Sequence, residues 1–217
     1  MQAIVLHGTL TSARAWNWRA ALLQVLPYAK RIQLEARDAV GRNAGLAGIA
    51  LALLGAERLS IAGDNALLSR VADLSFPQDG KPAFATPPYF SISHSALRVC
   101  CALSVDADLG IDLETFDGTG GEQARLRLQT WTAIEATLKA AGQGLRHAES
   151  VSVRPDLTSA LLAGTVYAVQ PVTLAPDCVC HVAALQRCKI ETEFVDLASE
   201  GVSTLLQDRF GLGAQRD

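Results

Sequence analysis

Leu109-Gly110-Ile111-Asp112-Leu113-Glu114 is the stretch of this chain that carries the most information about its fold and its chemistry. It has the character of a β-strand, and side chains alternate between the two faces of a strand. Ile111 and Leu113 therefore project from one face, while Asp112 and Glu114 project from the other. The sequence predicts a strand that presents two carboxylates on one face.

A second stretch is predicted to be helical: Trp131-Thr132-Ala133-Ile134-Glu135-Ala136-Thr137-Leu138-Lys139. Its period places Glu135 and Lys139 one turn apart on one face. Three converging carboxylates with a lysine beside them are what a hard cation needs to hold a phosphate. Two simpler interpretations stay open at this point. The strand pair could be solvated carboxylates, and the helix pair could be an exposed ion pair that contributes roughly 0.3–0.5 kcal/mol.

Two stretches upstream of the acidic strand carry groups that suit a phosphate: Gly80-Lys81-Pro82 and Ser91-Ile92-Ser93-His94-Ser95. The first is turn chemistry, and alone it is a surface turn. In the second, alternation places the three serines on one face, with Ile92 and His94 on the other. A hydroxyl-rich segment with a histidine and a nearby lysine suits a phosphate cradle, although a lone histidine is more often a structural residue.

The remaining segments outline a mixed fold. The Ala-, Leu- and Gly-rich segment 43–56 predicts a buried helix, and 122–141 predicts a second helix that ends at Gly142. Strands are predicted at 59–62, 71–76, 89–93, 98–105, 150–154, 162–169, 178–185 and 189–195. Residues 1–36 are predicted to be irregular and the C-terminal tail frayed. This outline predicts the α+β class with two similar subdomains, 1–107 and 108–217, each a helix packed on a small antiparallel sheet.

Composition excludes several classes of protein. The 217 residues carry a net charge of −3 without a basic run, so we expect no nucleic-acid partner. The longest apolar run, 44–56, falls short of the roughly 18 residues that suggest a membrane span. The N-terminus lacks a basic region before its apolar residues, so we expect no signal peptide and a cytoplasmic location. The five cysteines do not suggest a disulfide framework, and Cys178 and Cys180 are expected in a strand core.

A hydrolase interpretation is weak. His7-Gly8 is similar to the oxyanion turn near the start of an α/β-hydrolase. That fold also needs a Gly-x-Ser-x-Gly elbow around its nucleophile, and this chain contains none.

Taken in order over residues 80–144, four motifs resemble the signature set of 4′-phosphopantetheinyl transferases, most closely the surfactin-synthetase-type branch. They are Gly80-Lys81-Pro82, Phe90-Ser91-Ile92-Ser93-His94-Ser95, Leu109-Gly110-Ile111-Asp112-Leu113-Glu114 and Trp131-Thr132-x-x-Glu135-Ala136-x-x-Lys139. The resemblance implies a two-lobed monomer. It implies Mg²⁺-dependent transfer of the phosphopantetheine arm of coenzyme A to a serine of an acyl, peptidyl or aryl carrier protein, with release of 3′,5′-ADP. The alternative is a non-catalytic module of the same fold that binds coenzyme A or a carrier protein.

The resemblance also implies the roles of single residues. Asp112, Glu114 and Glu135 would hold Mg²⁺, Glu135 would accept the serine proton, and Lys139 would pair with the pyrophosphate; the implied catalytic group is Glu135, Lys139 and Asp112. The residues implied to contact the nucleotide and its 3′-phosphate are Lys81, Pro82, Ser93, His94, Arg42 and Arg37.

The chain departs from the family at two places. Ile134 stands where the family usually has a lysine, so one cationic contact is lost. The segment between Glu114 and Trp131 is short, whereas many relatives carry an extra helical segment there that helps to meet the carrier protein.

Overall fold

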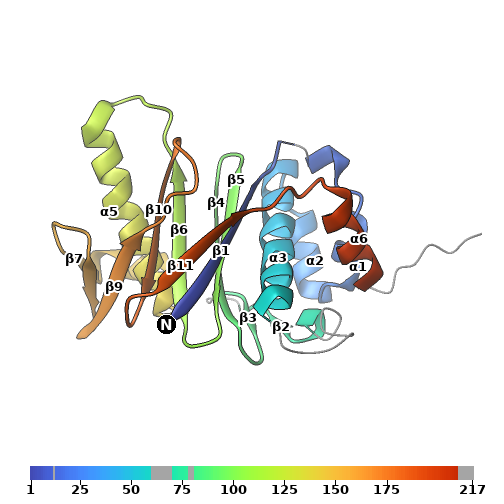
Figure 1. Cartoon of the computed structure of the whole chain (residues 1–217), viewed down its shortest axis with the longest axis horizontal. Helices are drawn as coiled ribbons and strands as arrows, with labels where there is room; N and C mark the ends of the chain where they lie inside the picture. The colour runs from blue at the N-terminus through green and yellow to red at the C-terminus, as the bar shows by residue number, and fades with distance from the viewer. Residues whose placement is uncertain (12, 60–69, 78–80, 210–217) are drawn as a thin grey trace, which may run out of the picture.

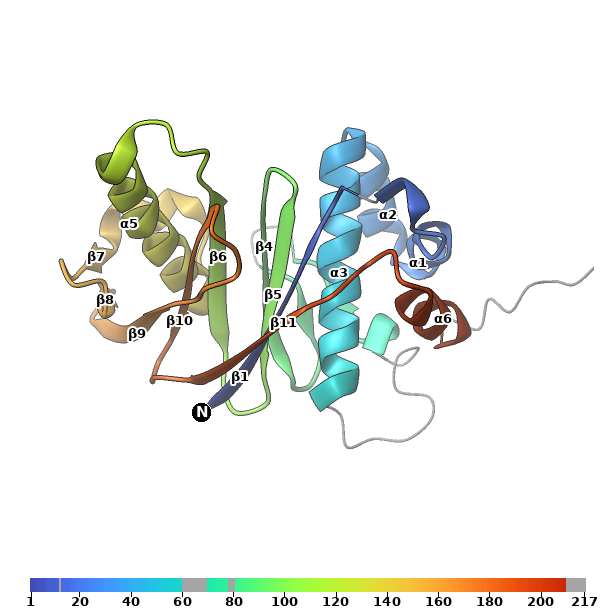
Figure 2. The ribbon, with the colours of Figure 1, turned by 45° about the horizontal axis from the view of Figure 1, so that its top comes forward.

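The computed structural model of the chain describes residues 1–11, 13–59, 70–77 and 81–209. Its architecture is mixed α+β, which confirms the predicted class. Two sheets lie between one long helix on one side and a group of helices on the other (Figures 1 and 2).

The first sheet has the strand order β11-β1-β5-β4, with bounds Lys189–Phe194, Gln2–Thr9, Arg98–Ser104 and Tyr89–Ser95. The second has the order β6-β10-β9-β8-β7, with bounds Leu109–Thr115, Cys178–Ala184, Thr165–Pro171, Ser159–Leu162 and Ser152–Val153. A two-stranded ribbon pairs β2, Leu74–Ser75, with β3, Ala83–Phe84. All of these pairs are antiparallel except β1 with β11, which is parallel. The first sheet is therefore mixed, which corrects the prediction of an antiparallel sheet in each half.

The helices lie on the outer faces of the two sheets. Their bounds are α1, Arg19–Val25; α2, Tyr28–Glu35; α3, Ala39–Leu59; α5, Gly121–Ala140; and α6, Glu200–Arg209. Two short 3₁₀ helices, η1 at Ala13–Ala15 and η2 at Leu145–Ser150, complete the described elements. In Figure 1, α3 packs on the first sheet with α1, α2 and α6 behind it, and α5 packs on the second sheet.

Helix α3 confirms the buried helix predicted at 43–56 and extends it at both ends. Its glycines let it approach the sheet closely. A Cβ atom at Gly55 would lie 2.3 Å from Leu103 Cδ1, and one at Gly48 would lie 2.5 Å from Ile92 Cγ2. By length and composition this helix could cross a membrane, but 67% of its most apolar window is buried inside the fold. The helix therefore forms part of the core, and the predicted cytoplasmic location stays a prediction.

Three sequence-based predictions were wrong about elements. Residues 1–36 are not irregular, because β1 lies inside the first sheet and α1 and α2 pack beside α3. The strand predicted at 162–169 is two strands, β8 and β9, joined by a turn in which Ala163 and Gly164 both have positive φ. The C-terminal segment contains α6, whose Leu206 is fully buried. In the first and third segments, tertiary burial decides a structure that local pattern does not reveal.

Other predicted elements are confirmed in part or lie outside the described residues. The strand predicted at 71–76 is reduced to β2, and that at 150–154 to β7. The first residue of the turn predicted at Gly80-Lys81-Pro82 and most of the strand predicted at 59–62 lie outside the described residues.

The two halves of the chain share a core. One buried cluster between the sheets contains Val5 and Cys100 from the first sheet and Ile111 and Cys180 from the second. Strand β11, from the C-terminal part of the chain, pairs with β1 in the first sheet. The division at residue 107 stays a prediction, and by packing alone residues 189–209 lie with the first sheet and its helices.

A carboxylate cluster between the two lobes

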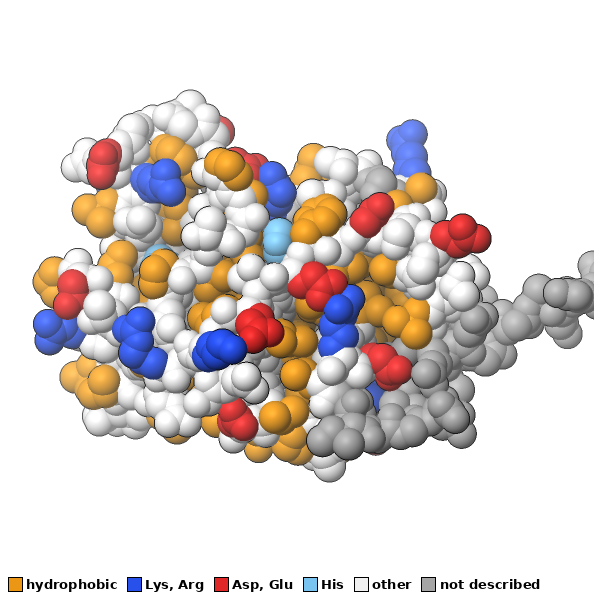
Figure 3. Space-filling view, viewed as in Figure 1, with side chains coloured by type: hydrophobic (Ala, Val, Ile, Leu, Met, Phe, Trp, Pro, Cys, Tyr) orange, Lys and Arg blue, Asp and Glu red, His pale blue; other side chains and the backbone are white. Residues whose placement is uncertain are grey.

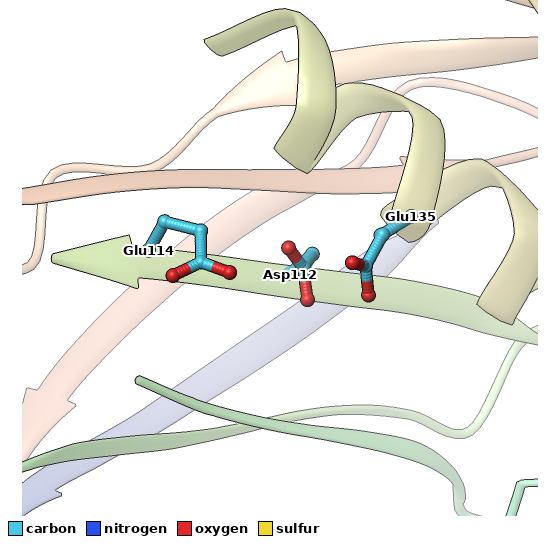
Figure 4. A group of neighbouring side chains, drawn as sticks. All are labelled: Asp112, Glu114 and Glu135. Atoms are coloured by element: carbon cyan, nitrogen blue, oxygen red, sulfur yellow. The ribbon is translucent and has the colours of Figure 1, made fainter. Parts of the chain in front are cut away.

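Asp112, Glu114 and Glu135 meet at the junction of β6 and α5, as Figure 4 shows. One carboxylate oxygen from each residue lies within 4.8 Å of the others. Asp112 and Glu114 come from the acidic face of β6, while Ile111 and Leu113 on its other face enter the core between the sheets. The arrangement is that predicted from the alternation of the strand.

Helix α5 comes close to β6 because residue 110 has no side chain. A Cβ atom at Gly110 would lie 2.0 Å from the carbonyl oxygen of Ala136 and 2.9 Å from Lys139 Cβ. The helix backbone thus rests directly on the strand backbone, which places Glu135 and Lys139 beside Asp112.

A hydrogen bond between Thr132 and His181 attaches the same helix to β10. Thr132 Oγ1 and His181 Nδ1 are 2.7 Å apart, and both side chains are buried. His181 lies opposite Asp112 in the register of β10 and β6. Burial lowers the pKa of His181 to about 4, so its ring is neutral at neutral pH. Thr132 belongs to the motif that begins at Trp131, but the sequence did not indicate that it would pair with His181.

Asp112 is the most buried member of the carboxylate cluster, with 2% of its surface exposed. Its Oδ1 accepts hydrogen bonds from Ser93 Oγ at 2.7 Å and from Lys139 Nζ at 2.5 Å. Its Oδ2 is buried without any partner. A buried, unpartnered carboxylate oxygen is costly unless a cation compensates it. The donor set therefore fits a hard divalent cation with oxygen ligands.

Glu135 is the titratable member of the cluster near neutral pH. Burial and then the negative charge of Asp112 raise the pKa of Glu135 to about 7, while the ammonium group of Lys139 opposes the rise. Lys139 Nζ lies 3.8 Å from Glu135 Oε2. A bound cation would lower this pKa, because it favours the ionised carboxylate.

The three serines of β4 face the edge of β6 and form a serine ladder, Ser91, Ser93 and Ser95. Their hydroxyls accept the backbone N–H groups of Ile111, Leu113 and Thr115 at 3.1, 3.2 and 3.2 Å. No backbone ladder joins these two strands, since β4 and β6 are edges of different sheets. Along β4 and β6, serine side chains therefore take the place of the main-chain hydrogen bonds that would join two strands of one sheet.

The predicted phosphate-binding residues fall into different places. Lys81 and Pro82 line a pocket of about 310 Å³ together with Glu135 and Lys139. Lys81 Nζ donates to Leu109 O at 2.7 Å and pairs with Asp108. This lysine therefore ties its loop to the start of the acidic strand.

His94 does not line that pocket and is exposed. Partial burial, followed by the charges of Arg37 and Lys139, lowers the pKa of His94. Arg37 is thus near enough to His94 for its charge to act on that ring. Arg42 instead lines a pocket of about 280 Å³ beside α1 that also contains Arg19 and Trp16. Of the two arginines, Arg37 is the one whose charge acts on a residue of β4, His94.

Ile134 faces away from the carboxylates. It is half-buried and packs against the apolar cluster between α5 and the second sheet, which includes Ala160 and Val169. Trp131, one turn before Glu135, has 38% of its surface exposed. A side-chain hydrogen bond with Trp131 opposes the rise in the pKa of Glu135, but its effect is smaller than that of burial.

A larger pocket, of about 750 Å³, opens at the end of β6 next to Glu114. Its walls come from both lobes, and among the lining residues are Leu97, Arg98, Thr115, Phe116 and Arg127. Arg98 forms an ion pair with Asp177 across this pocket, with Nη2 2.8 Å from Oδ1. Of the two pockets, the 310 Å³ pocket at Lys81 includes a carboxylate of the cluster, Glu135, in its wall, whereas the larger pocket is lined by Thr115, the residue after Glu114.

No family model matches this chain, and a search of curated proteins returned no match either. The function must accordingly be argued from the site.

Proposed function

We propose that this protein transfers the 4′-phosphopantetheine group of coenzyme A to a serine of a carrier protein, with Mg²⁺ as cofactor. The observation that carries the proposal is the carboxylate cluster, with the buried, unpartnered Oδ2 of Asp112, next to Lys139 and a pocket lined by Lys81 and Pro82. The four motifs that resemble the transferase family contribute the residues of this one region.

The proposed chemistry needs positioning and charge neutralisation more than covalent catalysis. A Mg²⁺ ion held by Asp112, Glu114 and Glu135 would neutralise the charge of the pyrophosphate. Lys139 carries a positive charge at the same place and would contact the phosphate oxygens. Glu135 would accept the proton of the attacking serine, directly or through water. The serine oxygen would bond to the phosphorus that carries the pantetheine arm, and the bond from that phosphorus to the bridging oxygen of the pyrophosphate would break. The leaving group is 3′,5′-ADP.

The proposed substrate contacts follow from the two pockets. Lys81 and Pro82 would line the nucleotide in the 310 Å³ pocket. Arg37 would add positive charge at the 3′-phosphate, and His94, whose pKa is lowered, would contact it as a hydrogen-bonding ring. The 750 Å³ pocket at the end of β6 is the proposed approach for the carrier serine, because it is lined by Thr115, the residue after Glu114. Two similar lobes related by a pseudo-twofold axis, a monomeric state and a cytoplasmic location complete the proposal.

The decisive experiment is incubation with coenzyme A, Mg²⁺ and a panel of apo carrier proteins, with intact mass as the readout. We expect one carrier to gain the mass of a phosphopantetheine group, and Asp112→Asn or a chelator to abolish the gain. Asp112→Asn keeps the size of the side chain, so the loss reports on charge. Full transfer by this variant, or transfer undiminished by chelation, would contradict the proposal.

The alternative function is a non-catalytic module that binds coenzyme A or a carrier protein. The observation that favours it is the packing of Ile134, which leaves the cluster with one cation fewer than the family pattern has. Coenzyme A binding by calorimetry separates the two functions. Binding without transfer to any carrier in the panel would support the module.

A further inference from the structure

Ser93 makes a contact with the carboxylate cluster that uses the full capacity of its hydroxyl. Its Oγ donates to Asp112 Oδ1 at 2.7 Å. The same oxygen accepts the N–H of Leu113 at 3.2 Å and an N–H of Lys139 Nζ at 3.2 Å. One donor and two acceptor sites are all that a serine hydroxyl offers. This side chain therefore has no group left for a nucleotide, which argues against the nucleotide contact expected from the sequence.

Ser95 repeats this pattern one step along β6. Its Oγ donates to Glu114 Oε2 at 2.6 Å and accepts the N–H of Thr115 at 3.2 Å. Each of the two serines thus holds one carboxylate oxygen and the backbone N–H of the residue after that carboxylate.

Ser91 is the third member of the serine ladder and lacks the carboxylate contact. Its Oγ accepts the N–H of Ile111 at 3.1 Å, as the other two serines do for their partners. The residue before Ile111 is Gly110, which has no side chain to orient. The chain thus offers a serine that keeps the bond between the sheets but contacts no proposed cation ligand.

We propose that Ser93 and Ser95 are positioning residues that hold Asp112 and Glu114 in the geometry needed to bind a divalent cation. The inference rests on the proposed cation site. Groups that hydrogen-bond to metal ligands fix the orientation of those ligands, and their loss typically weakens metal binding about 10- to 100-fold. Here the two orienting hydroxyls come from the first sheet, while the carboxylates they orient belong to the second. The affinity for the cation would then depend on how β4 of the first sheet is positioned against β6 of the second.

The test is a titration with Mn²⁺ alone, in which electron paramagnetic resonance measures the concentration of free Mn²⁺ and so gives the affinity. We expect Ser93→Ala and Ser95→Ala to bind Mn²⁺ about 10-fold more weakly or worse, and Ser91→Ala to remain within about twofold of wild type. All three variants should lose thermal stability, because each removes a hydrogen bond between the sheets. Ser95→Thr keeps the hydroxyl and should restore the affinity lost in Ser95→Ala.

The outcomes separate the inference from the proposed function. If the wild type binds Mn²⁺ no better than Asp112→Asn, the proposed cation site itself is wrong. If the wild type binds tightly and all three alanine variants bind equally well, the site stands and the positioning role is overturned. If Ser93→Ala fails to fold, the less buried Ser95, with its alanine and threonine variants, decides the question.

Discussion

At the scale of single residues, the site is controlled by how differently its three carboxylates are surrounded. Asp112 is buried and has two partners on one oxygen and none on the other. Glu114 has one oxygen held by Ser95, and Glu135 has a pKa raised to about 7. A cation would therefore find one preorganised ligand and one that must lose a proton at neutral pH.

The raised pKa of Glu135 predicts how stability depends on pH without a cation. The folded protein holds the Glu135 proton up to about pH 7, whereas a free glutamate carboxyl has a pKa of 4.5. The contribution of Glu135 is thus fully present below pH 4.5 and is lost as pH rises through 7. We expect the stability of the wild type, measured relative to Glu135→Gln, to fall between pH 5 and pH 8 in chelator.

The comparison with Glu135→Gln is needed because other groups act in the opposite direction. His181 and His94 have lowered pKa values, so their contributions rise with pH over part of this range. They are present in both proteins and cancel in the difference. Urea unfolding at several pH values gives the measurement. A difference that does not change with pH would mean that Glu135 ionises normally in the folded state. Added Mg²⁺ should reverse the loss above pH 7 in the wild type alone.

At the scale of elements, the position of α5 on β6 determines whether the carboxylates meet. We predict that Gly110→Ala separates them, because a Cβ atom there would lie 2.0 Å from the carbonyl oxygen of Ala136. The helix must shift as a body, since the obstructing atoms are backbone. We expect a loss of about 1–3 kcal/mol in unfolding free energy. We also expect weaker Mn²⁺ binding than in the wild type, because Glu135 would no longer lie beside Asp112.

Gly201→Ala is the matched control for this substitution. A Cβ atom at Gly201 meets no atom within 4 Å, and the residue lies in the first turn of α6. This variant should be neutral or stabilised by up to about 1 kcal/mol. A Gly110→Ala protein with wild-type stability and Mn²⁺ affinity would show that α5 does not rest on the strand backbone as described.

The packing of Ile134 leads to a prediction about the departure from the family pattern. Ile134→Lys should lower the melting temperature without improving coenzyme A affinity, because the side chain points into the apolar cluster of the second lobe. We expect a destabilisation of about 1 kcal/mol, since a partly buried ammonium loses apolar contact and solvation. Calorimetry and thermal unfolding on one preparation give both values, with Ile134→Leu as the control. Tighter binding of coenzyme A at unchanged stability would contradict this placement.

At the scale of the whole molecule, the site depends on two sheets that share a core but no backbone ladder. The core cluster between them contains residues of β1, β5, β6 and β10. Strands β4 and β6 lie side by side (Figure 2), and the serine ladder joins them. Residues far apart in sequence therefore form the proposed cation site together. The geometry of the site is sensitive to any movement of the first sheet relative to the second.

The surface of the molecule bears on the expected partners. On the face shown in Figure 3, basic and acidic side chains are interspersed, and no stripe of one charge crosses it. This agrees with the net charge of −3. The absence of a nucleic-acid partner, like the carrier protein and coenzyme A, stays a prediction.

The sequence alone determined the features that follow from the repeat of a strand or a helix. Alternation in Leu109–Thr115 and the spacing of Glu135 and Lys139 placed the site residues on the correct faces of a strand and a helix. The α+β class and the buried helix around 43–56 followed in the same way. These features are local, because the geometry of a strand or helix sets them without reference to the rest of the chain.

Only the tertiary structure decided what depends on contacts between distant segments. It placed β1 and β11 side by side, although neither segment carries a signal for parallel pairing. It turned Ser93 toward Asp112, brought Arg37 near His94, and set Arg42 and Ile134 in other surroundings. The physical reason is that the alternation of side chains fixes the face of the strand on which a residue lies. Which residues contact that face depends on burial and on the elements that pack against it.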